Sequence, residues 1–185
     1  MLLCTAITNV IGYQTNSFDN IIVLEFSFSE PIFEKTNIDE NIFTAVSINN
    51  LSKIHDLGKP ILPVKSVRVL LPQGTDIENI EISSSEEIIL GFGFNIKAEG
   101  YVVPISKIIN EDNKPEISAI SFNSLYSYVG VYTFRGFSIL HLNLHPIQYD
   151  ASNGKISYYN SMKLIVETKN GEINKALEAI QMILK

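Results

Sequence analysis

The sequence predicts an all-β fold, an antiparallel β-sandwich of jelly-roll-like type followed by a C-terminal amphipathic helix. Short runs of alternating apolar residues recur along the chain, and turn residues separate them. Helical periodicity is almost absent before residue 170 and appears only in the tail. We therefore expect a β-sandwich domain over residues 1–169 and a helix or linker over residues 170–185.

Most of the predicted strands show apolar residues on alternate positions and end at glycine, proline, asparagine or serine. The predicted strands before residue 135 are Ile21–Ser29, Ile42–Ile48, Val64–Leu70, Ile77–Ser83, Glu87–Ile96, Ile117–Phe122 and Tyr126–Phe134. Pro60 and Pro63 supply no amide, so they belong before a strand or on a sheet edge. The segment Gly91-Phe92-Gly93 completes no phosphate-binding motif, and we expect a bulge or a close backbone approach there.

The strongest alternating pattern predicts a hairpin. Its first strand is Gly136–Tyr149, its turn is Asp150–Gly154, and its second strand is Ser157–Thr168. The interior side chains of the second strand are predicted to be Tyr158, Met162, Leu164 and Val166.

The tail from Gly171 to Lys185 repeats apolar residues at helical spacing, which predicts an amphipathic helix of about four turns. The helix either docks on the sandwich or starts a linker. Docking is the favoured interpretation, because exposed apolar stripes are rare in monomers.

Composition and charge narrow the classes of function. The chain has 185 residues, 45% of them hydrophobic, which suits one folded domain. A net charge of −6 with scattered basic residues argues against nucleic-acid binding. No apolar run approaches the roughly 20 residues needed to cross a bilayer, and no intact signal peptide is present, so we expect a soluble chain as given.

Residues that often perform catalysis do not form a catalytic pattern here. His141 and His145 would lie about 13 Å apart on one strand, too far to share a metal ion. His55 has no serine or cysteine that the sequence places beside it, and the single cysteine, Cys4, lies near a terminus. The remaining candidates are acidic groups that we expect to be solvated or isolated: Glu78, Glu81, Glu86, Glu87, Asp39-Glu40 and Glu111-Asp112. We predict a non-catalytic domain without a metal or cofactor.

Two blocks of sequence resemble the propeptides of gingipain-type cysteine peptidases, the C25 family of clan CD. The first block is Gly58–Val64 (GKPILPV) followed by Leu71–Gly74 (LPQG). The second block is Tyr132–Phe137 (YTFRGF), Leu142–Tyr149 (LNLHPIQY) and Gly154–Tyr159 (GKISYY). The blocks occur in the expected order, and neither is a catalytic motif.

This resemblance implies a β-sandwich that keeps a cysteine peptidase latent and assists its folding by covering the active-site cleft. The partner would be the catalytic domain in the same precursor, and the location would be extracellular or in the cell envelope. Because gingipain-type enzymes cleave after basic residues, a basic side chain is the expected blocking group. Arg135 is the first candidate and Lys59 the second. Alternatively, Arg135 only pairs with a nearby carboxylate on the surface.

Two other classes of function compete with this interpretation. The chain would otherwise be a non-catalytic β-sandwich adhesion or accessory module of a secreted multidomain protein, since sandwiches serve many functions. A carbohydrate-active enzyme is disfavoured, because the sequence fixes no pair of acids and contains no tryptophan. The oligomeric state stays open.

Overall fold

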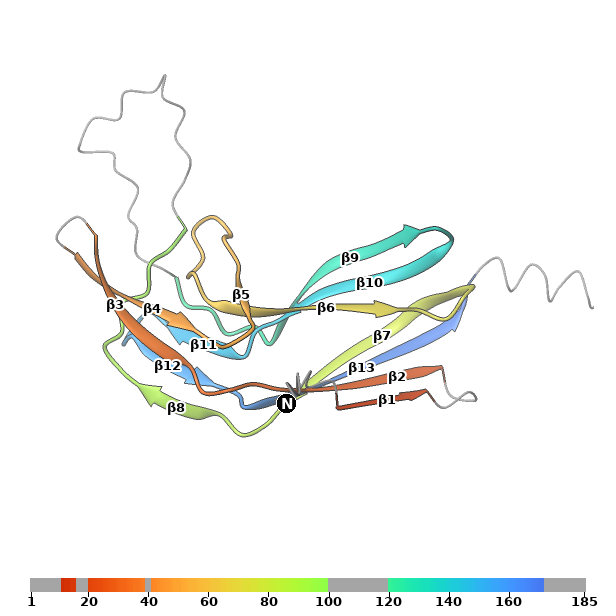
Figure 1. Cartoon of the computed structure of the whole chain (residues 1–185), viewed down its shortest axis with the longest axis horizontal. Helices are drawn as coiled ribbons and strands as arrows, with labels where there is room; N and C mark the ends of the chain where they lie inside the picture. The colour runs from red at the N-terminus through yellow and green to blue at the C-terminus, as the bar shows by residue number, and fades with distance from the viewer. Residues whose placement is uncertain (1–10, 16–19, 39–40, 100–119, 172–185) are drawn as a thin grey trace, which may run out of the picture.

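The computed structural model describes residues 11–15, 20–38, 41–99 and 120–171 (Figure 1). Within these ranges the chain contains only β-strands, turns and irregular segments, and every strand ladder is antiparallel, which confirms the all-β prediction. The strands are β1 (Ile11–Thr15), β2 (Ile21–Ser27), β3 (Ile32–Ile38), β4 (Asn41–Ser47), β5 (Ser52–Lys53), β6 (Pro63–Leu70), β7 (Thr75–Ser84), β8 (Ile88–Gly91), β9 (Tyr126–Phe134), β10 (Phe137–Leu144), β11 (Ile147–Asp150), β12 (Lys155–Tyr158) and β13 (Ser161–Asn170).

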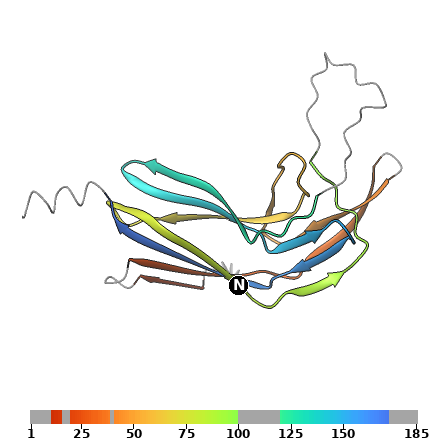
Figure 2. The ribbon, with the colours of Figure 1, turned by 180° about the vertical axis from the view of Figure 1, so that it is seen from behind.

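Two four-stranded sheets form the larger part of the fold. One has the order β1-β2-β13-β7 and the other has the order β5-β6-β10-β9. Figures 1 and 2 show the two sheets as two layers when the molecule is viewed from opposite sides. Strands that are distant in sequence are therefore neighbours, such as β2 beside β13 and β6 beside β10.

The hydrophobic core lies between these layers. Leu140 and Leu142 of β10 are fully buried, as are Leu164 and Val166 of β13. All four belong to one cluster of buried side chains that draws residues from both sheets. Alternation along each strand places these side chains on the inner face, because successive residues of a strand point to opposite sides.

Two smaller sheets, β11-β12-β8 and β3-β4, occupy the other end of the molecule (Figure 1). Their buried side chains, among them Ile147, Ile156 and Val46, extend the same core cluster. Phe33 and Phe94 stack with their ring centroids 5.0 Å apart. This end of the fold is thus packed continuously with the two larger sheets.

The predicted long hairpin is only partly present. Its turn joins β11 and β12, and Tyr149 faces Ile156. However, the first predicted strand is interrupted after Leu144, and the second is interrupted at Tyr159-Asn160, so β10 and β13 pair with other strands. Pro146 offers no amide to a ladder, which allows the chain to leave one sheet and enter another. The predicted interior side chains of the second strand are nevertheless all buried: Tyr158, Met162, Leu164 and Val166.

Other predicted strands differ in accuracy. Tyr126–Phe134 has the predicted bounds, whereas only Ile88–Gly91 of the predicted strand Glu87–Ile96 is a strand. The ladder beside Gly91 contains the expected irregularity. The strand predicted at 117–122 is wrong in its described part, because Phe122 forms only an isolated bridge with Tyr149. Strand β3 was not predicted, because its polar centre does not show a clear alternation.

Several sequence predictions fall outside the described residues. They are the C-terminal helix, the acidic pairs Asp39-Glu40 and Glu111-Asp112, and Cys4. The described part of the chain has no helix long and apolar enough to span a membrane.

Candidate functional site

The hairpin of β9 and β10 brings the first candidate, Arg135, to an exposed tip. Phe134 faces Phe137 in the ladder, so Arg135 and Gly136 form a two-residue loop. Their φ angles are 51° and 83°. Positive φ angles at both loop residues are typical of the tight turn whose twist matches that of antiparallel strands.

The outer part of this hairpin, residues 128–137, is here called the hairpin arm. It is apolar and exposed on both sides: its exposed large hydrophobic side chains are Tyr128, Val129, Val131, Tyr132, Phe134 and Phe137. Arg135 is the one charged residue in the arm. Contiguous exposed apolar surface is typical of a site that binds a partner.

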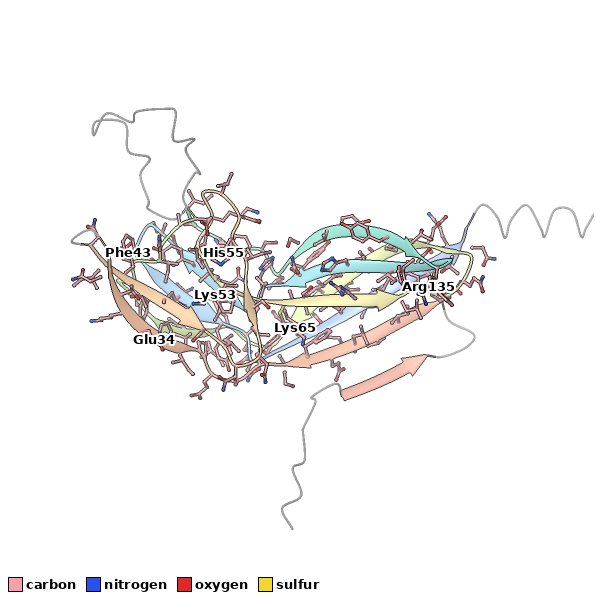
Figure 3. All side chains as sticks on the ribbon, turned by 45° about the horizontal axis from the view of Figure 1, so that its top comes forward. Glu34, Phe43, Lys53, His55, Lys65 and Arg135 are labelled. Carbon is pink, nitrogen blue, oxygen red and sulfur yellow. The ribbon has the colours of Figure 1, made fainter. Side chains whose placement is uncertain are left out.

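The side chain of Arg135 forms no ion pair with a carboxylate in the part of the chain that the structure describes. Its guanidinium carbon instead lies 5.2 Å from the ring centroid of Phe134. Figure 3 shows Arg135 at the outer end of the upper layer. The described residues therefore do not include the carboxylate partner that the surface-pairing alternative requires.

The second candidate, Lys59, lies in the loop between β5 and β6. Its ammonium group contacts the carboxylate of Asp56 at 3.0 Å. Backbone hydrogen bonds fasten the loop to the neighbouring segment, with Glu99 N donating to Lys59 O at 3.0 Å and Gly58 N donating to Glu99 O at 3.0 Å. His55 adds a side-chain hydrogen bond to Glu99. Lys59 is thus already paired and belongs to an anchored loop.

The two candidates lie at opposite ends of one sheet. Strand β10 begins beside the Arg135 tip and ends at Leu144, which faces Lys65 near the start of β6. About eight residues of extended chain separate these ends, which corresponds to roughly 26 Å. A single specificity pocket can therefore receive Arg135 or Lys59 but not both.

A buried histidine beside the Lys59 loop was not predicted as part of a site. His145 is 4% exposed, hydrogen-bonds through Nε2 to Ser127 Oγ at 3.0 Å, and contacts the ring of Phe122 edge-on. It lines a very small cavity together with Lys59 and Asp56. Burial lowers the pKa of His145 to about 4, and the charge of Lys59 adds to this effect while that of Asp56 opposes it. The sequence signal was a polar residue within an apolar run and directly before a proline.

The other polar candidates do not assemble into a catalytic or metal site. His141 bonds to Ser66 at 2.8 Å, away from His145. Within the described ranges, no group of three or more histidine, cysteine or acidic side chains could hold a metal ion.

Two acidic residues line a polar hollow of about 200 Å³. The pKa of Glu87 is lowered chiefly by its hydrogen bond from Lys155, and that of Asp150 chiefly by its bond from Ser152. A glycosidase needs one acid whose pKa is raised so that it keeps a proton. The shifts at Glu87 and Asp150 go in the other direction, which disfavours the carbohydrate-active alternative at this hollow.

Comparison with known proteins gives one family match. The family model Propeptide_C25 matches residues 14–185, which is most of the chain. The comparison with curated proteins finds no match.

Two solved structures share the fold. One is described as a complex of Porphyromonas gingivalis RgpB pro- and mature domains; it has 13% sequence identity, a TM-score of 0.63, and coverage of 88% of this chain and 85% of that chain. The other concerns the zymogenic latency of gingipain K from Porphyromonas gingivalis; it has 20% identity, a TM-score of 0.66, and coverage of 92% and 98%. The family match over residues 14–185 agrees with the resemblance in the two sequence blocks and with the prediction of a non-catalytic domain. The chain belongs to the family of C25 peptidase propeptides.

Proposed function

We propose that this domain keeps a C25 cysteine peptidase latent and assists its folding by covering the active-site cleft, with the peptidase domain in the same precursor. The family match over residues 14–185 is the observation on which the proposal depends. The titles of the two similar structures support it, since one describes a complex of pro- and mature domains and the other describes zymogenic latency. An extracellular or cell-envelope location, as the family implies, is part of the same proposal.

The proposed contact is the hairpin arm, with Arg135 as the blocking side chain. The arm is exposed and apolar, and a basic group at its tip suits a pocket that accepts basic residues. Lys59 stays the second candidate. It is less suited, because binding in a pocket would require it to give up its contact with Asp56.

The architecture that we propose is a β-sandwich of jelly-roll-like type over residues 1–169, followed by the helix or linker at 170–185. The two four-stranded sheets and their shared core support the sandwich. The adhesion or accessory module is not favoured, because the matched family consists of propeptides.

The test is inhibition of gingipain-type peptidases by the purified domain, using one enzyme that cleaves after arginine and one that cleaves after lysine. The variants are Arg135→Ala and Lys59→Ala. Arg68→Ala is the matched control, because Arg68 is the other arginine of the chain and is exposed on β6. We expect Arg135→Ala to weaken inhibition by at least about tenfold, as for loss of an interface anchor.

The possible results separate the parts of the proposal. Inhibition that is weakened only by Lys59→Ala would transfer the blocking role to Lys59. If neither substitution changes the inhibition, neither Arg135 nor Lys59 is the blocking residue, and the inhibitory function itself still holds. The absence of inhibition of either enzyme at micromolar concentration would contradict the inhibitory function and favour the binding module.

A further inference from the structure

A hollow of about 220 Å³ lies beside the β3–β4 hairpin and joins apolar with basic side chains. Phe43, which is 7% exposed, and Ile61 supply its apolar part. Lys53, His55 and Lys97 supply three nitrogen-bearing side chains. Figure 3 shows Phe43, Lys53 and His55 together at the end of the molecule opposite Arg135.

Backbone pairing brings the walls of this hollow together from distant parts of the sequence. Lys53 belongs to β5, which pairs with the start of β6. Ile61 N donates a hydrogen bond to Lys97 O at 3.0 Å, and Thr44 N of β4 donates to Asn95 O at 2.7 Å. The segment around residues 95–97 is therefore fastened on one side to the chain before β6 and on the other side to β4.

The two lysines of the hollow have no acidic partner in the part of the chain that the structure describes. Neither Lys53 nor Lys97 forms an ion pair there through its ammonium group. Two ammonium groups that line the same hollow repel each other. An anion bound beside them would replace this repulsion with charge-assisted hydrogen bonds.

The acidic residues closest to the hollow along the chain do not compensate this charge. Glu99 accepts a hydrogen bond from His55, and Asp56 contacts Lys59 at 3.0 Å. Glu34 on β3 forms no ion pair among the described residues. The hollow is thus a local basic site in a chain whose net charge is −6.

The size and chemistry of the hollow indicate what it can bind. Its volume is below the roughly 300–1,000 Å³ of pockets that enclose a drug-sized ligand, so it suits one or two side chains of a protein. The lysines require a carboxylate, and Phe43 and Ile61 favour an apolar group beside it. An exposed ion pair strengthens binding by only about fivefold at most, so such a contact is useful mainly within a larger complex.

We propose that this hollow receives an acidic side chain, next to an apolar one, from the surface of the C25 peptidase domain. The inference rests on the proposed function, because it takes that peptidase as the partner. It adds a contact at the end of the domain opposite the hairpin arm. Two separated contacts hold a partner more tightly than one, because the second forms within a complex that already exists.

The first test is the affinity of the purified domain for a peptidase domain whose catalytic cysteine is replaced by alanine. Surface plasmon resonance at low and at high salt gives the dissociation constant. Lys53→Glu combined with Lys97→Glu should raise this constant at least about tenfold at low salt and less at high salt, because salt screens the contact. The double substitution to glutamine should have a smaller effect in the same direction.

The matched control is Lys163→Glu combined with Lys169→Glu. Both residues are exposed on β13 in the other large sheet, and the control changes the net charge by the same amount. It should leave the affinity within about twofold of the wild type, since surface charges far from a contact have small effects. Urea unfolding of each variant verifies that it is folded.

The second test is cross-linking of the complex with a carbodiimide, which joins a carboxylate to a lysine amine that touches it. Mass spectrometry should find Lys53 or Lys97 joined to an aspartate or glutamate of the peptidase. The same experiment with added inorganic phosphate distinguishes a protein carboxylate from a free anion. We expect phosphate to reduce the cross-link without abolishing it.

The results separate this inference from the proposed function. Unchanged affinity in the Lys53→Glu, Lys97→Glu variant, equal weakening by the control, or a complex without a cross-link from either lysine would overturn the inference alone. A complex that phosphate weakens but that yields no such cross-link would mean that the hollow takes a free anion, which also overturns it. A wild-type domain that does not bind the peptidase would overturn the proposed function and this contact together.

Discussion

Arg135 and Gly136 both have positive φ angles, 51° and 83°, and together they form the whole loop between β9 and β10. Glycine adopts this backbone region without a steric penalty, whereas another L-residue loses roughly 1–2 kcal/mol there. Asparagine tolerates the region better than arginine does and is common in such loops. Arginine is therefore a locally unfavourable choice at position 135.

A single substitution at this loop should separate stability from inhibition. Arg135→Asn is expected to raise the free energy of unfolding by about 0.5–1 kcal/mol, because the backbone strain decreases. The same variant should inhibit a peptidase that cleaves after arginine at least about tenfold more weakly. Urea unfolding and an inhibition assay measure the two effects. Arg68→Asn, in the middle of β6, should show neither effect; a loss of stability in Arg135→Asn would contradict the strain argument.

The stability of the domain should fall with acidification through His145. Its pKa in the folded protein is about 4, below the ordinary value of 6.5, chiefly because it is buried. The unfolded chain therefore takes up a proton at this residue below pH 6.5, whereas the folded chain does so only near pH 4. The free energy of unfolding is therefore unaffected by this residue above pH 6.5. It decreases as the pH falls from 6.5 toward 4, by at most roughly 3 kcal/mol.

The measurement is chemical unfolding of the wild type and of His145→Gln between pH 6.5 and pH 4. The variant should have a flatter pH profile, and the difference between the two proteins removes the contribution of the carboxylates that both share. His141→Gln is the control, because it removes an imidazole from a less buried place on β10, the strand that ends one residue before His145. If the pH profiles of the wild type and of His145→Gln run parallel, burial does not lower the pKa of His145.

Gly154 is predicted to be far less tolerant of alanine than its neighbour Gly93. Both have positive φ angles, 63° and 75°, so alanine strains the backbone of both by about 1 kcal/mol. An added Cβ at Gly154 would lie 2.6 Å from the carbonyl oxygen of Phe94, whereas at Gly93 it would meet nothing within 4 Å. We expect Gly154→Ala to cost about 1–3 kcal/mol more in unfolding free energy than Gly93→Ala. If both substitutions lower the unfolding free energy equally, the β11–β12 turn does not pack closely against the backbone of Gly93 and Phe94.

Leu142 should be among the costliest truncations in the core. Its side chain has 0% exposure and belongs to the cluster shared by the two large sheets. Leu142→Ala should lower the unfolding free energy by about 2–5 kcal/mol, through lost burial and the cavity that remains. Ile89→Ala, at a residue that is 54% exposed on β8, should change it by only about 0.5 kcal/mol. A small effect at Leu142 would mean that the two layers are not tightly packed against each other.

Strand positions were predictable from sequence where alternation was strong, and pairing was not. Tyr126–Phe134 was predicted with its observed bounds. The chain from Gly136 to Tyr149 was predicted as one strand, yet Pro146 divides it between two sheets. Alternation shows that a residue faces a core, but two successive strands can show the same alternation while they pair with different neighbours.

The sequence by itself determined the all-β class, the buried faces of several strands and the two blocks that resemble C25 propeptides. It also supplied Arg135 and Lys59 as candidates. Only the tertiary structure decided that β9 lies at a sheet edge, that Arg135 is at a tip while Lys59 is anchored, and that His145 is buried. The physical reason is that strand formation and turns depend on neighbouring residues, whereas sheet order and burial arise from contacts between strands that are far apart in the chain.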